Sequence, residues 1–151
     1  MNRLFNGVHK SVYDDSVRYI DANIKELFRY LEKKRIINDD SVVVVNADHG
    51  EEFFDHGKYG HQQRLFRPNI NVPLIFYSPN RLPSPSAEER PVSLIDIAPT
   101  LLRFANIPPP PVFKGKNIFE DDDRDVVAQA SESEGDLSRA VFTGITIIRD
   151  G

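Results

Sequence analysis

The chain has 151 residues, 40% hydrophobic and 28% charged, which is ordinary for one globular domain able to bury a core. Its net charge of -4 offers no basic surface for nucleic acid. The absence of cysteine excludes disulfides, thiolate zinc sites and cysteine nucleophiles. No apolar run approaches the ~20 residues of a membrane span, and no signal peptide is evident. The compartment is therefore unknown, with a cytoplasmic location as the default expectation.

The first half of the chain predicts a helix followed by a buried strand. An apolar stripe at helical spacing covers residues 13–34, and Ser11 and Asp14 are the candidate caps at its start. The stripe consists of Tyr13, Val17, Ile20, Ile24, Leu27 and Leu31. Residues 38–40 form a predicted turn. Residues 42–45 follow without polar alternation, which is typical of a central parallel strand covered on both faces. This order of elements indicates an α/β fold.

The second half predicts further elements of the same fold. Residues 50–71 are polar and irregular, and a loop of that length in a compact domain is usually functional. Residues 72–77 predict a strand, and residues 93–106 predict a helix with a proline in its first turn. Residues 126–130 and 140–148 predict two strands that form a C-terminal hairpin.

The strongest chemical signal is Asp48-His49-Gly50, directly after the buried strand. Ligands of α/β sheets bind at the carboxyl ends of strands. Adjacent side chains of a regular strand point to opposite faces, so both residues can bind one metal only if the backbone turns sharply, which Gly50 permits. A carboxylate beside an imidazole suits Mn²⁺, Zn²⁺ or Fe²⁺, whereas Ca²⁺ and Mg²⁺ are less natural partners for nitrogen. The alternative is a strand-end turn in which Asp48 caps a following helix.

Other charged residues follow the Asp-His pair. His61 is a candidate to contact an anionic substrate oxygen or to protonate a leaving group, and otherwise an exposed loop histidine. Lys58, Arg64 and Arg67 either steer an anion toward the metal or are solvated surface charges. His56 is expected to structure the loop.

Two acidic features have structural interpretations. Glu51 and Glu52 are expected to begin a short helix, where carboxylates favour the N-terminus. The acidic run at residues 120–123 lacks the spacing and the glycine of an EF-hand calcium loop, so we interpret it as a solvated turn.

Three ordered motifs carry a resemblance to a known family. They are a strand ending in Asp-His-Gly-Glu and followed by Gly-His at residues 42–61, a Val-Pro-Leu-Ile strand at 71–79, and a Ser-Leu-Ile-Asp-Ile-Ala-Pro-Thr-Leu helix at 92–102. Over about 13–119 the chain resembles the sulfatase-like branch of the alkaline phosphatase superfamily. The resemblance implies that residues 1–151 form a single domain, the C-terminal portion of a sulfatase-like catalytic domain. The implied fold is a partial alkaline-phosphatase-like α/β sandwich, with helices packed on a mixed, mainly parallel sheet and a C-terminal β-hairpin.

The resemblance also implies a chemistry. It is the hydrolysis of sulfate, phosphate or phosphonate esters at a divalent metal ion, Ca²⁺ or Mn²⁺ in the first place, with Zn²⁺ or Mg²⁺ as alternatives. Asp48 and His49 take the positions of two metal ligands, and His61 that of the residue that binds the transferred group. A histidine as second ligand resembles the phosphodiesterase, phosphonate hydrolase and phosphoglycerol-transferase relatives, because many sulfatases have asparagine there.

The chain departs from the family pattern in what it lacks. The early half of such proteins carries the nucleophile and two further metal-binding carboxylates, and here no cysteine or serine precedes an x-Pro-x-Arg motif. We therefore expect the isolated chain to be inactive, with the N-terminal half of a catalytic domain as its partner. The alternatives are a non-catalytic α/β binding or interaction module derived from this family, and a phosphomutase-type member of the superfamily.

Overall fold

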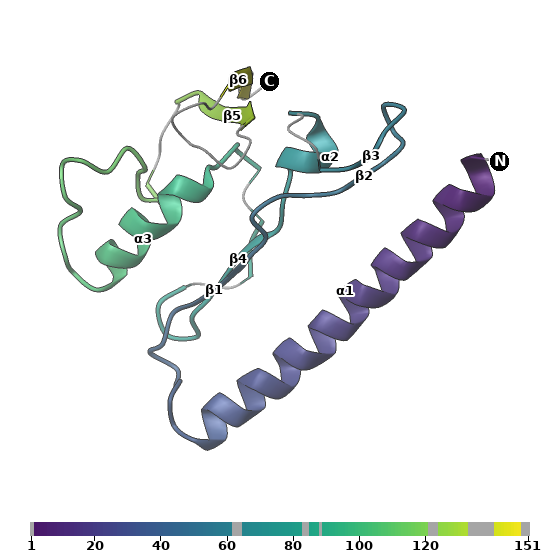
Figure 1. The fold of residues 1–151 in the computed structure, drawn as a ribbon. Helices are drawn as coiled ribbons and strands as arrows, with labels where there is room; N and C mark the ends of the chain where they lie inside the picture. The colour runs from purple at the N-terminus through teal and green to yellow at the C-terminus, as the bar shows by residue number, and fades with distance from the viewer. Residues whose placement is uncertain are drawn as a thin grey trace.

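The body of the molecule is a two-stranded ladder between two helices. The computed structural model describes residues 2–61, 65–82, 85–87, 89–120, 124–132 and 141–148. Strands β1 (Val43–Asn46) and β4 (Leu74–Tyr77) form the ladder. Helices α1 (Asn2–Lys33) and α3 (Ile97–Phe104) lie on opposite sides of it (Figure 1).

Aromatic side chains hold the helices to the two faces of the ladder. Consecutive residues of a strand point to opposite faces. Tyr77 accordingly meets Phe28 of α1, with ring centroids 5.6 Å apart. On the other face Phe76 packs edge-on against Phe119 at 5.4 Å, and Phe119 packs against Phe104 of α3 at 5.6 Å. The α/β prediction is confirmed at the level of mixed helices and strands.

The predicted parallel pairing is not found in the described part of the chain. β1 pairs with β4 antiparallel, with Val43 opposite Tyr77 and Asn46 opposite Leu74. The reason lies in the connection between them. After β1 the chain makes a hairpin and a short helix, and it enters β4 from the end at which it left β1. A parallel partner would require a crossover back to the start of β1.

Helix α1 is longer than its apolar stripe predicts. It begins at Asn2, so the expected caps Ser11 and Asp14 lie inside the helix, and that prediction is wrong. It ends close to the predicted position. The Ile36 N–H donates to the Leu31 carbonyl at 2.9 Å, and Arg35 adopts the left-handed conformation with φ 57°. This is the hydrogen-bonding pattern of a Schellman motif, with arginine where glycine is usual.

The predicted irregular loop contains a small hairpin and a short helix. Strands β2 (Glu52–Phe53) and β3 (Tyr59–Gly60) pair antiparallel, and α2 (Arg67–Ile70) follows. The expected helix start at Glu51 and Glu52 is therefore wrong, because Glu52 opens a strand. The aromatic residues on one face of the hairpin explain its position. The ring of Phe53 lies 5.1 Å from that of Tyr13, which anchors the hairpin on α1.

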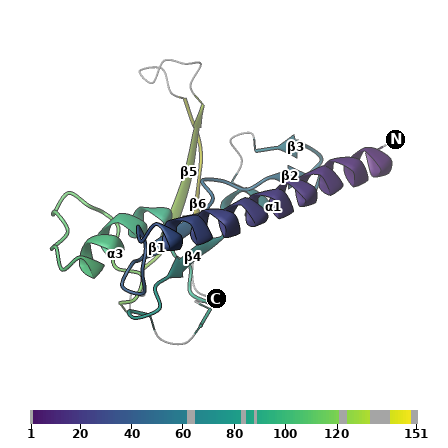
Figure 2. The ribbon, with the colours of Figure 1, turned by 90° about the horizontal axis from the view of Figure 1, so that it is seen from below.

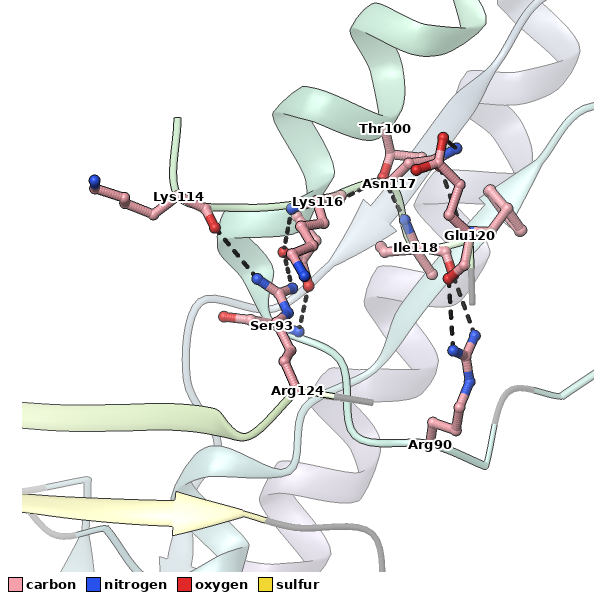
Figure 3. Close-up of polar contacts among 11 residues, drawn as sticks. Arg90, Ser93, Thr100, Lys114, Lys116, Asn117, Ile118, Glu120 and Arg124 are labelled. Atoms are coloured by element: carbon pink, nitrogen blue, oxygen red, sulfur yellow. Dashed lines mark hydrogen bonds and ion pairs between the residues drawn. The ribbon is translucent and has the colours of Figure 1, made fainter. Parts of the chain in front are cut away.

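Asp96 organises the segment around α3. It ends a 3₁₀ turn, η1 (Leu94–Asp96), that leads into the helix, and its side chain is 2% exposed. The backbone N–H groups of Ser93 and Lys116 donate to its carboxylate at 3.0 and 2.9 Å. The guanidinium of Arg124 also donates to it. Figure 3 shows Ser93, Lys116 and Arg124 converging on this point. One carboxylate thus joins the helix start, the loop before Glu120 and the segment that enters β5.

Thr100 of α3 adds a second tie to the same loop. Its hydroxyl oxygen accepts the Ile118 N–H at 3.0 Å, and the side chain is fully buried (Figure 3). The backbone of this loop also approaches the backbone of η1 closely. A Cβ on Gly115 would lie 2.0 Å from the Ile95 carbonyl oxygen, so this position requires glycine.

The C-terminal β-hairpin is present as predicted. Strands β5 (Val126–Glu132) and β6 (Val141–Ile148) pair antiparallel, with an irregularity between Ala130 and Ser131. The hairpin projects from the rest of the molecule (Figure 2). Val127 and Ile147 lie opposite each other and are about half exposed.

Apolar burial is sparse in the described part of the chain. Val126, at 7% exposure, and Pro99 are the buried apolar side chains there, and the other buried side chains are polar. α1 leaves a broad apolar surface uncovered, formed by Val8, Val12, Val17, Tyr19, Ile20, Leu27 and Tyr30. Within the described residues, no helix is long and apolar enough to cross a membrane.

Gly50 connects the end of β1 to α2. Its N–H donates to the Asn69 carbonyl at 2.8 Å, and a Cβ added to Gly50 would lie 1.9 Å from the Pro68 carbonyl oxygen. The sequence suggested that this glycine permits a sharp turn. The structure gives a different reason, which is the close approach of two backbones.

We predict that Gly50→Ala lowers the free energy of unfolding by about 1–3 kcal/mol, because the new methyl group forces α2 away. Gly7→Ala is the matched control. Gly7 lies inside α1 with nothing within 4 Å of its Cβ position, so alanine should stabilise the helix by up to about 1 kcal/mol. Urea unfolding of both variants measures the difference. Equal effects would contradict the assigned close approach.

We also predict that Asp96→Ala lowers the free energy of unfolding by at least about 3 kcal/mol, because two backbone donors and a guanidinium lose a buried acceptor. Asp15→Ala removes an ion pair with Arg18 whose side chains are 75% and 72% exposed, so it should cost less than about 1 kcal/mol. Urea midpoints of the two variants test this contrast. Similar midpoints would show that the Asp96 contacts contribute little.

Candidate functional site

Asp48 and His49 lie where β1 has ended and the chain turns toward the hairpin. The Asp48 Oδ1 atom accepts the His49 N–H at 2.9 Å, which leaves Oδ2 available. The His49 Nδ1 atom lies 3.0 Å from the Gly50 carbonyl oxygen. A carbonyl only accepts, so Nδ1 carries the hydrogen and the neutral ring presents a lone pair at Nε2.

The two remaining atoms fit a shared metal ion. Asp48 Oδ2 lies 3.8 Å from His49 Nε2. Ligands that bind one ion at about 2.0–2.2 Å lie roughly 3–4 Å apart, so the separation allows both to bind together. The Asp48 side chain is 89% exposed and can reach an ion without burying an unpaired charge. Across the described residues no group of three or more potential ligands is assembled, so the pair offers fewer ligands than a metal ion normally takes.

The hairpin brings His61 to His49. The two rings stack with centroids 4.1 Å apart and an angle of 27° between their planes. His61 Nδ1 lies 3.2 Å from Glu51 Oε2. A histidine predicted only from the Gly-His motif therefore lies directly beside the Asp48–His49 pair. An anion bound at that pair would be within reach of its ring.

The remaining candidates lie farther away or outside the described residues. Lys58 is exposed at the turn end of the β2–β3 hairpin, whereas His61 follows its open end, roughly 10 Å away by strand rise. Arg64 lies outside the described residues, so its placement beside the site is untested. Arg67 begins α2 and is exposed.

His56 has the structural role expected from the sequence. Its N–H donates to Glu52 Oε1 at 2.8 Å, and its ring Nδ1 lies 2.7 Å from the same oxygen. The ring stacks on Phe66 with centroids 3.8 Å apart. These contacts fix the turn of the hairpin, in which Gly57 has φ 80°.

The sequence interpretation missed Glu51 and Glu52 as partners of histidines. The sequence does contain a signal for the hairpin that joins Glu51 to His61. Phe53 and Tyr59 flank a turn that contains Gly57, and aromatic residues on both sides of such a turn indicate a hairpin.

The acidic run at residues 120–123 is described only at Glu120. Hydrogen bonds from the side chains of Asn117 and Arg103 lower the pKa of the Glu120 carboxyl.

Several curated proteins are similar to this chain. Arylsulfatase K of Mus musculus is 31% identical over 102 residues, which are 66% of this chain and 17% of that protein. The N-acetylglucosamine-6-O-sulfatase of Bacteroides thetaiotaomicron is 25% identical over 130 residues, 86% of this chain and 22% of that protein. The 2,3-bisphosphoglycerate-independent phosphoglycerate mutase of Cellvibrio japonicus is 32% identical over 113 residues, 74% of this chain and 20% of that protein. The chain thus spans about a fifth of the length of these relatives.

The family itself is established by a match to the sulfatase family as a whole. The sequence pattern of the sulfatase family matches residues 6–107. That range includes most of α1, both strands of the β1–β4 ladder, the Asp48–His49 pair and His61. It also includes α3 and Asp96, the buried carboxylate on which the second half of the fold converges. The chain therefore belongs to the sulfatase family.

Proposed function

We propose that this chain contributes part of the active site of a metal-dependent hydrolase of sulfuric or phosphoric esters. The observation that carries the proposal is the 3.8 Å separation of Asp48 Oδ2 and His49 Nε2, beside the stacked ring of His61. A divalent ion held there would act as a Lewis acid toward an ester oxygen. Ca²⁺ and Mn²⁺ are the first candidates from the family, with Zn²⁺ and Mg²⁺ as alternatives.

The roles of the side chains follow from their chemistry. Asp48 and His49 each offer one free ligand atom to the metal. His61 offers Nε2 to the transferred group, because its Nδ1 faces Glu51. A protonated ring there would donate to an anionic oxygen or protonate a leaving group. Lys58 is proposed as a more distant attractor of an anionic substrate, and Arg64, outside the described residues, is proposed to attract the same anion.

We propose further that the remaining ligands and the nucleophile come from residues outside this chain. Support comes from the length of the relatives, of which the chain spans 17–22%. The uncovered apolar residues of α1 are a suitable surface for such a partner, since an apolar patch of that kind usually marks an interface. The partner would be the earlier part of a sulfatase-like catalytic domain. The isolated chain would then be inactive.

A second candidate is phosphoryl chemistry of the phosphomutase type. The similarity of the chain to a phosphoglycerate mutase, at 32% identity, supports this second candidate. Sulfate and phosphate are both tetrahedral anions recognised by the same kinds of donors, so the described residues favour neither.

We predict that the isolated chain binds Mn²⁺ weakly and saturably, and that Asp48→Asn and His49→Gln each abolish this binding. Two ligand atoms hold an ion loosely, and one holds it hardly at all. Asp39→Asn, an exposed carboxylate near the opposite end of β1, is the matched control and should leave binding unchanged. Calorimetric titration with Mn²⁺, Ca²⁺ and Zn²⁺ measures all four proteins. Binding that survives both site substitutions would contradict the assignment of the metal ligands.

We predict that the isolated chain turns over neither aryl sulfates nor phosphate mono- or diesters, with any of these ions. The reason is that no cysteine or serine of the sequence precedes an x-Pro-x-Arg motif, and that no third metal ligand joins Asp48 and His49 among the described residues. Turnover that disappears in Asp48→Asn would show that the chain is a complete enzyme, and the division of the site between this chain and a partner would be wrong.

A further inference from the structure

Two consecutive glutamates at the start of the hairpin each face a different histidine. Glu51 Oε2 lies 3.2 Å from the Nδ1 atom of His61, and Glu52 Oε1 lies 2.7 Å from the Nδ1 atom of His56. Neighbouring side chains of a strand point to opposite faces, which places the two pairs on opposite sides of the hairpin. Glu52 is fully buried, and its carboxylate stabilises the turn of the hairpin through its contacts with His56. Glu51 faces the ring beside the candidate metal ligands.

The backbone of the hairpin determines the contact between Glu51 and His61. Glu52 pairs with Gly60, so Glu51 and His61 are the next opposing residues in the register. Gly60 adopts φ 98°, and its Cβ position lies 3.6 Å from Glu51 Oε1. The glutamate side chain therefore lies over the glycine. The Glu51 side chain is 21% exposed and that of His61 is 55% exposed, so the carboxylate is the more sheltered partner.

We propose that Glu51 is a positioning residue for His61, acting within the proposed active site. A carboxylate at Nδ1 draws the ring hydrogen to that nitrogen and fixes the orientation of the ring. Nε2 is then the ring nitrogen that faces a ligand. The stack against His49 fixes the plane of the ring, and Glu51 fixes its rotation in that plane.

A direct role of Glu51 as a third metal ligand is the competing explanation. Among the described residues, Glu51 does not form a three-ligand group with Asp48 and His49. Its Oε2 atom is instead engaged by His61. The positioning role therefore agrees better with the geometry, and metal titration separates the two explanations.

The test reads the tautomer of His61 in the 151-residue chain. Long-range ¹H–¹⁵N spectra of the labelled chain are recorded without metal at one mildly alkaline pH, and the His61 signals are identified by their loss in His61→Gln. We expect the Nδ1–H form of His61 to predominate. In Glu51→Ala the Nε2–H form should become the major one, as in free histidine. Glu51→Gln, which keeps an acceptor oxygen, should retain the Nδ1–H form. Glu26→Ala, an exposed glutamate of α1, is the control and should leave the His61 signals unchanged.

Three results would overturn the proposal. A predominant Nε2–H form in the unsubstituted chain overturns it even if Glu51→Ala fails to fold. An unchanged tautomer in a folded Glu51→Ala variant also overturns it. Mn²⁺ binding lost in Glu51→Ala would make Glu51 a ligand instead. Because the spectra require neither metal nor substrate, this test fails or succeeds independently of Mn²⁺ binding by Asp48 and His49.

Discussion

The buried carboxylate of Asp96 is the interaction on which the second half of the fold depends. A carboxylate with 2% exposure loses nearly all its hydration, and the loss must be offset by hydrogen bonds. Two backbone N–H groups and the Arg124 guanidinium supply them. Those donors come from the start of the helix, from the loop after it and from the segment before β5. The carboxylate therefore fixes the loop before Glu120 and the segment before β5 to the start of α3, and Phe76, Phe104 and Phe119 pack this part of the chain against the β1–β4 ladder.

The candidate site around Asp48 and His49 is built by backbone contacts. The Gly50 N–H holds the α2 backbone against the end of β1, and the hairpin then returns His61 to a position beside His49. Asp48 and His49 each use one polar atom locally and leave one free. The two free atoms of the proposed ligand pair are therefore 3.8 Å apart without any bound ion.

The sequence predicts the elements of this fold better than their pairing. The apolar run of β1 and the stripe of α1 are local patterns, and both elements form within about a residue of their predicted C-terminal ends. The antiparallel partner of β1 depends on the path of residues 50–71, where no single pattern dominates. Asp48, His49 and His61 were identified from motifs. Glu51 is predicted at a helix start because carboxylates favour that position, whereas in the structure its partner His61 lies ten residues away across the hairpin.

The contacts of Glu51 and Glu52 with two different histidines make the chemistry of the hairpin depend on its length. The side-chain period of a strand is two residues, so a single insertion or deletion within the turn at residues 54–58 would exchange the faces of everything after it. His61 would then lose Glu51 and turn away from His49, although every residue of the site would still be present. Loops usually tolerate changes of length, but the length of this turn determines which histidine contacts which carboxylate.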